Sequence, residues 1–430
     1  MRTGGGDSGE REAPLSAPAP EDVARVGSEP GFRAACRRLQ AWERWLQQRQ
    51  LELTAIAAPT GLEAGRAEWM RQQWQALGLR TELDEAGNVL AWRPGGSRAR
   101  AGALALTAHL DTAFPAGTPI RTEARGQRLY GPGICDNGAG LAALLALARC
   151  LQEGQARTRA PLLLVANVGE EGEGDLKGMR HLFRPGSVWS QRIAWTVVLD
   201  GPGTQQITSA ALPSLRIRVL LEGAGGHSWS DLGRASALHA GVRVATAALA
   251  QVRPQAGELG CNLGWMQGGS AVNAIAARAE LKWDLRARAP ERLRQLEQAL
   301  RRAVAQGVEE ENACALSGRV QARWERLGAR PGGSLAAGAP LLQVVRQVDV
   351  ALGIAAQLQC ASTDANIPIA LGRQALRLGA GGTAGGIHTL QEWYDPAGRT
   401  LALQRVLWVV AALTGMQWPR RRSRLSLAAD

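Results

Sequence analysis

Short apolar segments that end in polar or acidic residues alternate with helical segments, and this alternation limits the fold more than any other feature. Residues 104–109, 162–168 and 195–199 are apolar runs of strand length, and residues 140–151 have the pattern of a helix. Such alternation predicts an α/β domain with a mostly parallel central sheet flanked by helices. Ligands bind these sheets beyond the carboxyl ends of the strands.

A different pattern begins near residue 212. Residues 214–221 read SLRIRVLL, and this alternation predicts a strand with one solvent-facing side. The other expected elements of the region are strands at 259–266, 278–288 and 319–327 and helices at 235–252 and 290–305. The α/β pattern returns after the turn-rich segment 330–333, so we expect a small α+β domain inserted into a larger one.

These changes of pattern predict the domain boundaries. Residues 36–211 and 326–418 are expected to form the larger domain, and residues 212–325 the inserted one. The start of the chain, residues 1–35, is rich in Gly, Pro and acidic residues and is predicted to be a disordered tail. The arginine-rich end, residues 419–430, is predicted to be a basic tail.

The net charge of +12 raises the question of a nucleic-acid partner. Arginines supply nearly all of the positive charge and are spread along the chain, so we expect none. The six cysteines form no CxxC pair, which favours free thiols and a cytoplasmic location. No apolar stretch reaches the roughly 18 residues of a membrane span, and the N-terminus lacks the apolar core of a secretory signal. We therefore expect no membrane association.

The first expected strand ends in the sequence AHLDT. His109 and Asp111 are two residues apart, so they point to the same side of a strand. An imidazole with a carboxylate behind it suits a divalent metal, although the pair also fits a strand end with a turn-forming aspartate. Asp136 in GPGICDNGAG fits either a metal ligand or a helix N-cap. A dinucleotide-binding loop is excluded, because an aspartate there would repel a pyrophosphate.

Two adjacent glutamates, Glu170 and Glu171, follow the second expected strand. They would repel each other and lose hydration unless a positive group lay nearby. Asp200 ends a third strand in VVLDG, and His388 follows the glycine-rich segment 379–386. The residues expected to converge at the strand ends are His109, Asp136, Glu171, Asp200 and His388. Two imidazoles and three carboxylates suit two divalent cations that share a bridging carboxylate.

The chain also resembles a known family. The segments HLDT, GPGICDNGAG, GEEGEGDLKG, LDG, GGHS, GGSAVNAI, STDANIP and GIHTLQEWYD follow the order and spacing of the M20 family of dinuclear zinc peptidases. The resemblance covers roughly residues 40–415. The family includes peptidase T, carnosinase-type dipeptidases, glutamate carboxypeptidases and aminoacylases. The resemblance implies a zinc-exopeptidase-type α/β fold with an inserted α+β lid that also forms a homodimer.

The resemblance implies a set of metal ligands. His109 and Asp200 would bind one ion, Glu171 and His388 would bind the other, and Asp136 would bridge the two. The ions would be Zn²⁺, with Co²⁺ or Mn²⁺ as alternatives.

Further roles follow from the same resemblance. Glu170 would be the general base, Asp111 would lie behind His109, and the peptide bond between Asp136 and Asn137 would be cis.

The inserted domain carries further residues that match the family's motifs. His227 in GGHS resembles the histidine that reaches across the dimer to stabilise an oxyanion, although it also fits an ordinary loop histidine. Asn273 and Arg286 resemble the lid residues that hold a substrate carboxylate or carbonyl, a task that suits the bidentate arginine fork. Gly385 lies in the loop that would present backbone N–H groups to the substrate.

The resemblance implies hydrolysis of amide bonds in short peptides. An aspartate at position 200, where deacylases and carboxypeptidases often have glutamate, favours an aminopeptidase or dipeptidase. An N-acyl amino acid deacylase or carboxypeptidase on the same site is the alternative. A non-catalytic binding protein is disfavoured, because no ligand of the set is missing and the base is present.

Overall fold

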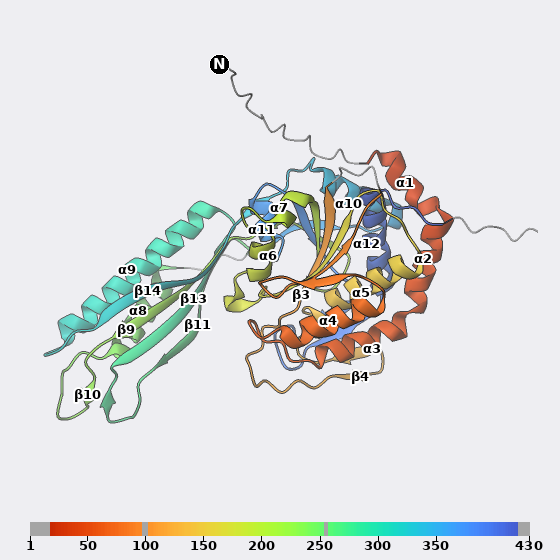
Figure 1. Cartoon of the computed structure of the whole chain (residues 1–430). Coiled ribbons are helices and arrows are strands. Elements are labelled where there is room, and N and C mark those ends of the chain that lie inside the picture. The colour runs from red at the N-terminus through yellow and green to blue at the C-terminus, as the bar shows by residue number, and fades with distance from the viewer. Residues whose placement is uncertain (1–17, 97–101, 253–256, 420–430) are drawn as a thin grey trace, which may run out of the picture.

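The structure is a computed structural model that describes residues 18–96, 102–252 and 257–419 of the 430-residue chain. These residues form a large α/β body and an elongated arm that projects from it (Figure 1). The two parts have separate hydrophobic clusters. The inserted α+β domain that the sequence predicts is this arm, which we call the lid.

A mixed nine-stranded sheet forms the centre of the large body, in the order β1-β2-β6-β3-β7-β17-β8-β15, with β16 paired to β8. Its strands are β1 (Thr81–Leu83), β2 (Val89–Arg93), β3 (Ala103–His109), β6 (Leu162–Asn167), β7 (Ile193–Leu199), β8 (Gln206–Ala211), β15 (Gly333–Ser334), β16 (Gln357–Ala361) and β17 (Gln374–Leu378). The central strands β6, β3, β7 and β17 are parallel, while β2 and β8 pair antiparallel with their central neighbours. The carboxyl ends of the central strands therefore meet at one edge.

Helices cover both faces of this sheet. They are α1 (Pro20–Ser28), α2 (Pro30–Ala41), α3 (Glu43–Thr54), α4 (Ala64–Ala76), α5 (Gly138–Glu153), α6 (Lys177–Leu182), α7 (Val188–Arg192), α10 (Pro340–Leu352), α11 (Asn366–Ala370) and α12 (Arg399–Thr414), with a 3-10 turn, η1, at Gly172–Gly174. Alternate residues of β3 divide between the two faces, because Leu104 and Leu106 join the cluster that contains α5, while Ala105 joins that of α6. All of β3 is buried, so its end holds His109 rigidly.

A second, small sheet brings two loops of the site together. Its order is β18-β19-β5-β4, with bounds β18 (Thr383–Gly385), β19 (Trp393–Asp395), β5 (Arg128–Tyr130) and β4 (Glu123–Arg125). Strand β5 leads into the loop before α5, and β18 and β19 flank the segment that holds His388. Pairing of β19 with β5 therefore places that histidine beside the Asp136 loop.

The lid is a four-stranded antiparallel sheet backed by two helices. Its strands are β9 (Ser214–Glu222), β11 (Leu259–Gly268), β13 (Arg278–Ala287) and β14 (Gln321–Arg330), its helices are α8 (Ala237–Gln251) and α9 (Pro290–Cys314), and its tip carries β10 (Gly226–His227) paired with β12 (Ala274–Ile275). The apolar residues of β9 pack on α8 and α9, as its alternation predicts. Its polar residues, including Arg216 and Arg218, occupy the opposite face.

Helix α9 extends beyond its expected end at residue 305. The extension is held by Glu311, which is buried and accepts hydrogen bonds from Ser236 N at 2.9 Å and from Arg243 Nε at 3.1 Å. Strand β14 likewise runs to Arg330, past the expected boundary at residue 325.

The prediction of a disordered tail over residues 1–35 is wrong for residues 20–35, which form α1 and the start of α2. Both helices pack on α12, and the indole Nε1 of Trp408 donates to the carbonyl oxygen of Val23 at 2.7 Å. Residues 1–17 and 420–430 lie outside the described residues. Among the described residues, no helix combines the length and the apolar character of a membrane span.

Candidate metal and catalytic site

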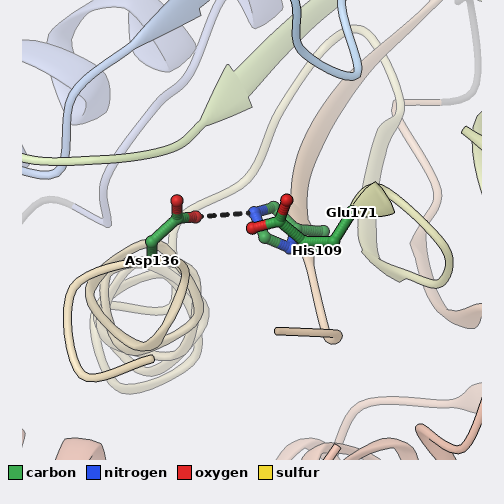
Figure 2. A group of neighbouring side chains, drawn as sticks. All are labelled: His109, Asp136 and Glu171. Atoms are coloured by element: carbon green, nitrogen blue, oxygen red, sulfur yellow. Dashed lines mark hydrogen bonds and ion pairs between the residues drawn. The ribbon is translucent and has the colours of Figure 1, made fainter. Parts of the chain in front are cut away.

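Three side chains from different elements meet at the carboxyl edge of the parallel strands (Figure 2). His109 ends β3, Asp136 lies in the loop just before α5, and Glu171 follows β6. One ligand atom from each lies within 4.8 Å of the others, and such a group of a nitrogen and two carboxylates can hold a divalent metal ion. The strand ends therefore bring these predicted residues together.

Asp136 lies between two histidines. Its Oδ1 is 3.1 Å from Nε2 of His109, and its Oδ2 is 3.1 Å from Nε2 of His388. The same nitrogen of His388 is 3.2 Å from Oε1 of Glu171. A carboxylate with one oxygen directed at each histidine has the geometry expected of a bridging ligand between two sites.

Asp200 joins the cluster on the His109 side. Its Oδ1 is 3.9 Å from Nε2 of His109, and its Oδ2 is 3.8 Å from Nε of Arg377. Its backbone N–H donates to the Leu378 carbonyl of the neighbouring strand β17 at 3.1 Å, which fixes its position at the strand end. All five predicted ligands thus lie at one place.

The electrostatics of the cluster show that it needs positive charge. Burial raises the pKa of Asp200, and the positive charge of Arg377 offsets part of this rise. Bonds to Asp136 and Glu171 raise the pKa of His388 to about 10. Burial opposes the charged form of Asp136, yet its bonds to His109 and His388 hold its pKa below the usual range. In the metal-free protein, protonated histidines supply the positive charge that these carboxylates require. A bound cation would replace those protons.

Asp111 organises the turn that holds the two glutamates. Its Oδ1 accepts the backbone N–H of Glu170 at 2.9 Å, and its Oδ2 accepts that of Glu171 at 2.8 Å and the hydroxyl of Thr60 at 2.9 Å. Its Oδ1 also lies 3.4 Å from Nδ1 of His109, whose Nδ1 is 3.1 Å from the Asp111 carbonyl. Asp111 therefore orients both the histidine and the acidic turn.

The Asp136 loop is supported by a residue to which the sequence assigned no role. The buried carboxylate of Glu392 accepts the backbone N–H groups of Gly133, Cys135 and Asp136 at 2.9, 2.8 and 3.0 Å. The peptide bond between Asp136 and Asn137 is cis, as the resemblance implied. Glu392 lies in the GIHTLQEWYD segment, but nothing local in that segment marks it as a partner of a distant loop.

Asp364 was also missed, although it lies in the STDANIP segment. It is fully buried and accepts from Nδ2 of Asn167, at the end of β6, at 2.7 Å. Burial raises its pKa to about 7. Its bond to Asn167 holds the end of β6, the strand that precedes the two glutamates.

Glu170 has an ionic partner that the sequence did not reveal. Nη1 of Arg330 is 2.8 Å from Oε1 of Glu170, and Nη2 donates to the Glu170 backbone carbonyl. Burial raises the pKa of Glu170 well above its usual value, Arg330 opposes this rise, and Glu171 adds to it. The positive groups beside the two adjacent glutamates are therefore Arg330 for Glu170 and His388 for Glu171.

The lid residues do not reach this cluster within one chain. His227 ends β10, which lies at the far end of the lid from β3 in Figure 1. Its Nδ1 accepts the N–H groups of Trp229 at 3.2 Å and Ser230 at 3.3 Å, which leaves Nε2 as an exposed donor. Asn273 is exposed beside it at the same tip, and its carbonyl accepts the N–H of Ser228 at 3.0 Å.

Arg286 and Gly385 occupy different parts of the molecule. Arg286 lies on the polar face of β13, where its Nε is 2.7 Å from Oδ2 of Asp284. Gly385 ends β18 and faces the Trp393 indole, which a Cβ at that position would approach to 2.7 Å. Packing of the Trp393 indole against position 385 therefore disfavours any side chain there.

Comparisons with known proteins agree with this geometry. The model of Peptidase family M20/M25/M40 matches residues 105–407. A protein of Pyrococcus abyssi (strain GE5 / Orsay), described as a LysW-lysine/LysW-ornithine hydrolase, is 29% identical over 167 residues, which are 39% of this chain and 43% of that protein. The match thus spans less than half of that relative's length.

Solved structures share the fold over most of the described chain. A tripeptidase from Staphylococcus aureus subsp. aureus Mu50 has a TM-score of 0.67 at 23% identity, covering 86% of this chain and 98% of its own. The aminopeptidase PepT from Bacillus cereus ATCC 10987 has a TM-score of 0.63 at 20% identity, and the match covers 85% of this chain and 98% of PepT. The dipeptidase Dug1p of Saccharomyces cerevisiae has a TM-score of 0.72 at 12% identity, and the match covers 89% of this chain and 98% of Dug1p. These likenesses confirm the predicted fold class.

Proposed function

Because the chain belongs to Peptidase family M20/M25/M40, we propose that it is a metal-dependent hydrolase that cleaves amide bonds of short peptides with water. The observation that carries this proposal is the position of Asp136 between His109 and His388, with Glu171 and Asp200 beside them. Such a donor set fits two divalent cations, and we propose Zn²⁺, with Co²⁺ or Mn²⁺ as alternatives.

We assign the ligands in two groups around a shared carboxylate. His109 and Asp200 would hold one ion, Glu171 and His388 would hold the other, and Asp136 would bridge them. When bound, divalent cations polarise a scissile carbonyl and make water a better nucleophile at neutral pH.

Glu170 is proposed as the general base. Its Oε1 is occupied by Arg330, and its Oε2 has no hydrogen-bond partner within the described part of the chain. Oε2 is therefore the atom that would accept a proton from the attacking water and pass it to the leaving nitrogen. Asp111 keeps the base in place by holding the Glu170 and Glu171 N–H groups.

The lid is proposed to complete the site in a homodimer. His227 presents an Nε2 donor at the lid tip, far along the arm from its own cluster, so a partner's lid is the natural source of an oxyanion donor. Trp229 near this tip is 79% exposed. Strand β11 is an open edge of the lid sheet with the exposed residues Trp265 and Met266. Exposed apolar groups on an unpaired edge are typical of a surface that a second copy covers.

Asn273 and Arg286 are proposed to bind a carboxylate or carbonyl of the substrate, and the N–H groups around Gly385 to contact its backbone. A lid that closes over the site limits the substrate to small molecules. We therefore propose di- and tripeptides as the substrate class. The free state of the cysteines in the structure supports our proposal of a cytoplasmic location.

A second candidate is an N-acyl amino acid deacylase or carboxypeptidase on the same site. The likeness to a protein described as a LysW-lysine/LysW-ornithine hydrolase favours it, because that name describes hydrolysis of a lysine or ornithine conjugate. Asp at position 200 favours the peptidase. Hydrolysis of di- and tripeptides and of N-acyl amino acids, each with added Zn²⁺, Co²⁺ or Mn²⁺, separates the two. Turnover of N-acyl amino acids alone would overturn the peptidase proposal, and turnover of neither class would overturn both.

A further inference from the structure

Arg330 joins the lid to the acidic turn of the site. It is the last residue of β14, the strand through which the chain leaves the lid, and its side chain is 3% exposed. The guanidinium contacts Glu170 through Nη1 and Nη2, and Nη1 also lies 3.1 Å from the hydroxyl of Ser362. A buried arginine thus has its main partner in the residue that we assign as the base.

The form of this contact restricts the Glu170 side chain. One guanidinium bonds both the side-chain Oε1 and the main-chain carbonyl of the same residue, so it closes a ring that includes the side-chain torsions of Glu170. A planar guanidinium can make such paired bonds, whereas an ammonium group cannot reproduce their geometry. With Oε1 held, Oε2 is left in a defined direction.

We propose that Arg330 is a positioning residue, which fixes the Glu170 carboxylate so that Oε2 faces the attacking water. This inference rests on the proposed function, because it takes Glu170 as the base. It also means that the base is oriented by the last residue of β14, at the junction between the lid and the large body.

Holding the chain in place does not require this ion pair. Nη2 of Arg180 donates to the Ala329 carbonyl at 2.7 Å, and Nδ2 of Asn366 donates to the Pro331 carbonyl at 2.9 Å. The residues on both sides of Arg330 are therefore attached to the large body by other hydrogen bonds. A buried ion pair contributes little net stability compared with apolar residues of the same size, so we attribute this one to the orientation of Glu170.

Arg180 provides a matched control. It anchors the same end of β14 and contacts Asp175, but it makes no bond to Glu170 in the described structure. We compare Arg330→Ala, Arg330→Lys and Arg180→Ala, each loaded with Zn²⁺ and assayed for metal content and steady-state kinetics. For Arg330→Ala we expect a fall in kcat of about 10- to 100-fold, the effect of losing a charged hydrogen bond, with KM and metal content near wild type.

The other two variants test whether the effect is one of orientation. Arg330→Lys should recover part of the lost kcat, because one charged bond to Oε1 can re-form. Arg180→Ala should keep kcat within about threefold of wild type. A fall in kcat that is the same for Arg330→Ala and Arg180→Ala, or that follows loss of metal, would overturn the proposal.

A second readout needs no substrate. Hydrogen–deuterium exchange of a peptide covering residues 168–174 should become faster in metal-free Arg330→Ala but not in Arg180→Ala, because only the first loses the bond to Glu170. Unchanged exchange in Arg330→Ala would also overturn the proposal. If the wild-type protein hydrolysed no amide, the proposed function would have failed, and exchange alone would still decide whether Arg330 orders Glu170.

Discussion

Oδ2 of Asp136 lies 3.1 Å from Nε2 of His388, although 252 residues separate the two in the chain. Its other oxygen, Oδ1, is equally close to His109. The small β18-β19-β5-β4 sheet makes this meeting possible, because it pairs the strands next to both segments. One carboxylate therefore faces two histidines at once, as the proposed bridging role of Asp136 requires.

Loss of Asp136 should remove more metal than loss of an outer ligand. In Asp136→Asn, the shared carboxylate charge is gone, so we expect a large loss of both ions. Asp200→Asn should lose mainly the ion beside His109. Metal content per chain after reconstitution and desalting, measured by mass spectrometry, tests this. Equal retention in the two variants would contradict a bridging role for Asp136.

Glu170→Gln should separate chemistry from metal binding. The amide keeps the shape of the side chain but cannot accept the proton, so we expect kcat to fall by about two to four orders of magnitude with metal content unchanged. Glu171→Gln should instead lose metal, because Glu171 contacts His388 in the cluster. Metal loss in Glu170→Gln together with metal retention in Glu171→Gln would show that the two roles are reversed.

Metal affinity should rise with pH. The pKa of His388 is raised to about 10 and that of His109 is raised well above its usual value, so both imidazoles carry protons near neutral pH in the metal-free protein. A cation can bind these nitrogens only after the protons leave, so binding releases protons and strengthens as pH rises. Competition with a chelator at pH 6, 7 and 8, and calorimetry in buffers of different ionisation enthalpy, measure this. An affinity that did not change with pH after correction for the chelator would contradict it.

Exchange of subunits should test the role of His227 in a dimer. His227→Ala and Glu170→Gln chains are each expected to be inactive alone. In a mixed dimer, one site combines an intact Glu170 with an intact His227 of the partner subunit, so part of the activity should return. Light scattering gives the oligomeric state, and labelled chains prove that exchange has occurred. No recovery despite proven exchange would contradict a trans role.

Arg286→Ala should weaken recognition of a substrate carboxylate. We expect a fall in kcat/KM that corresponds to a loss of roughly 2–4 kcal/mol of transition-state stabilisation. This is the scale for losing a desolvated charged hydrogen bond. The fall should be smaller for a substrate whose carboxylate is amidated. Arg218→Ala is a useful control, because Arg218 lies on the same face of the lid sheet and, like Arg286, is paired with lid carboxylates, but has no proposed contact with the substrate. Equal losses on free and amidated substrates would assign Arg286 a structural role.

Local residue order was sufficient to predict the parallel central strands of what is a mixed sheet, the inserted domain and the five clustered residues. Four of these residues adjoin an apolar strand or a helix start, and parallel strands bring such ends to one edge. The fifth, His388, follows a glycine-rich segment instead. His109, Glu171 and Asp200 could therefore be placed by their neighbours in the chain alone. The period of two in residues 214–221 likewise predicted a strand with one polar face, which the structure has.

Contacts between distant segments could not be predicted in this way. Arg330 lies 160 residues from Glu170, and Glu392 lies 259 residues from Gly133. Arg330 stands in the turn-like sequence RPGG, and nothing in that sequence marks a buried ion pair. Helix α1 was also missed, and its contact with α12 is likewise distant in sequence, since the Val23 carbonyl accepts a hydrogen bond from Trp408. Periodicity and strand ends are local properties of a chain, whereas the partner of a buried charge depends on which segments folding brings together.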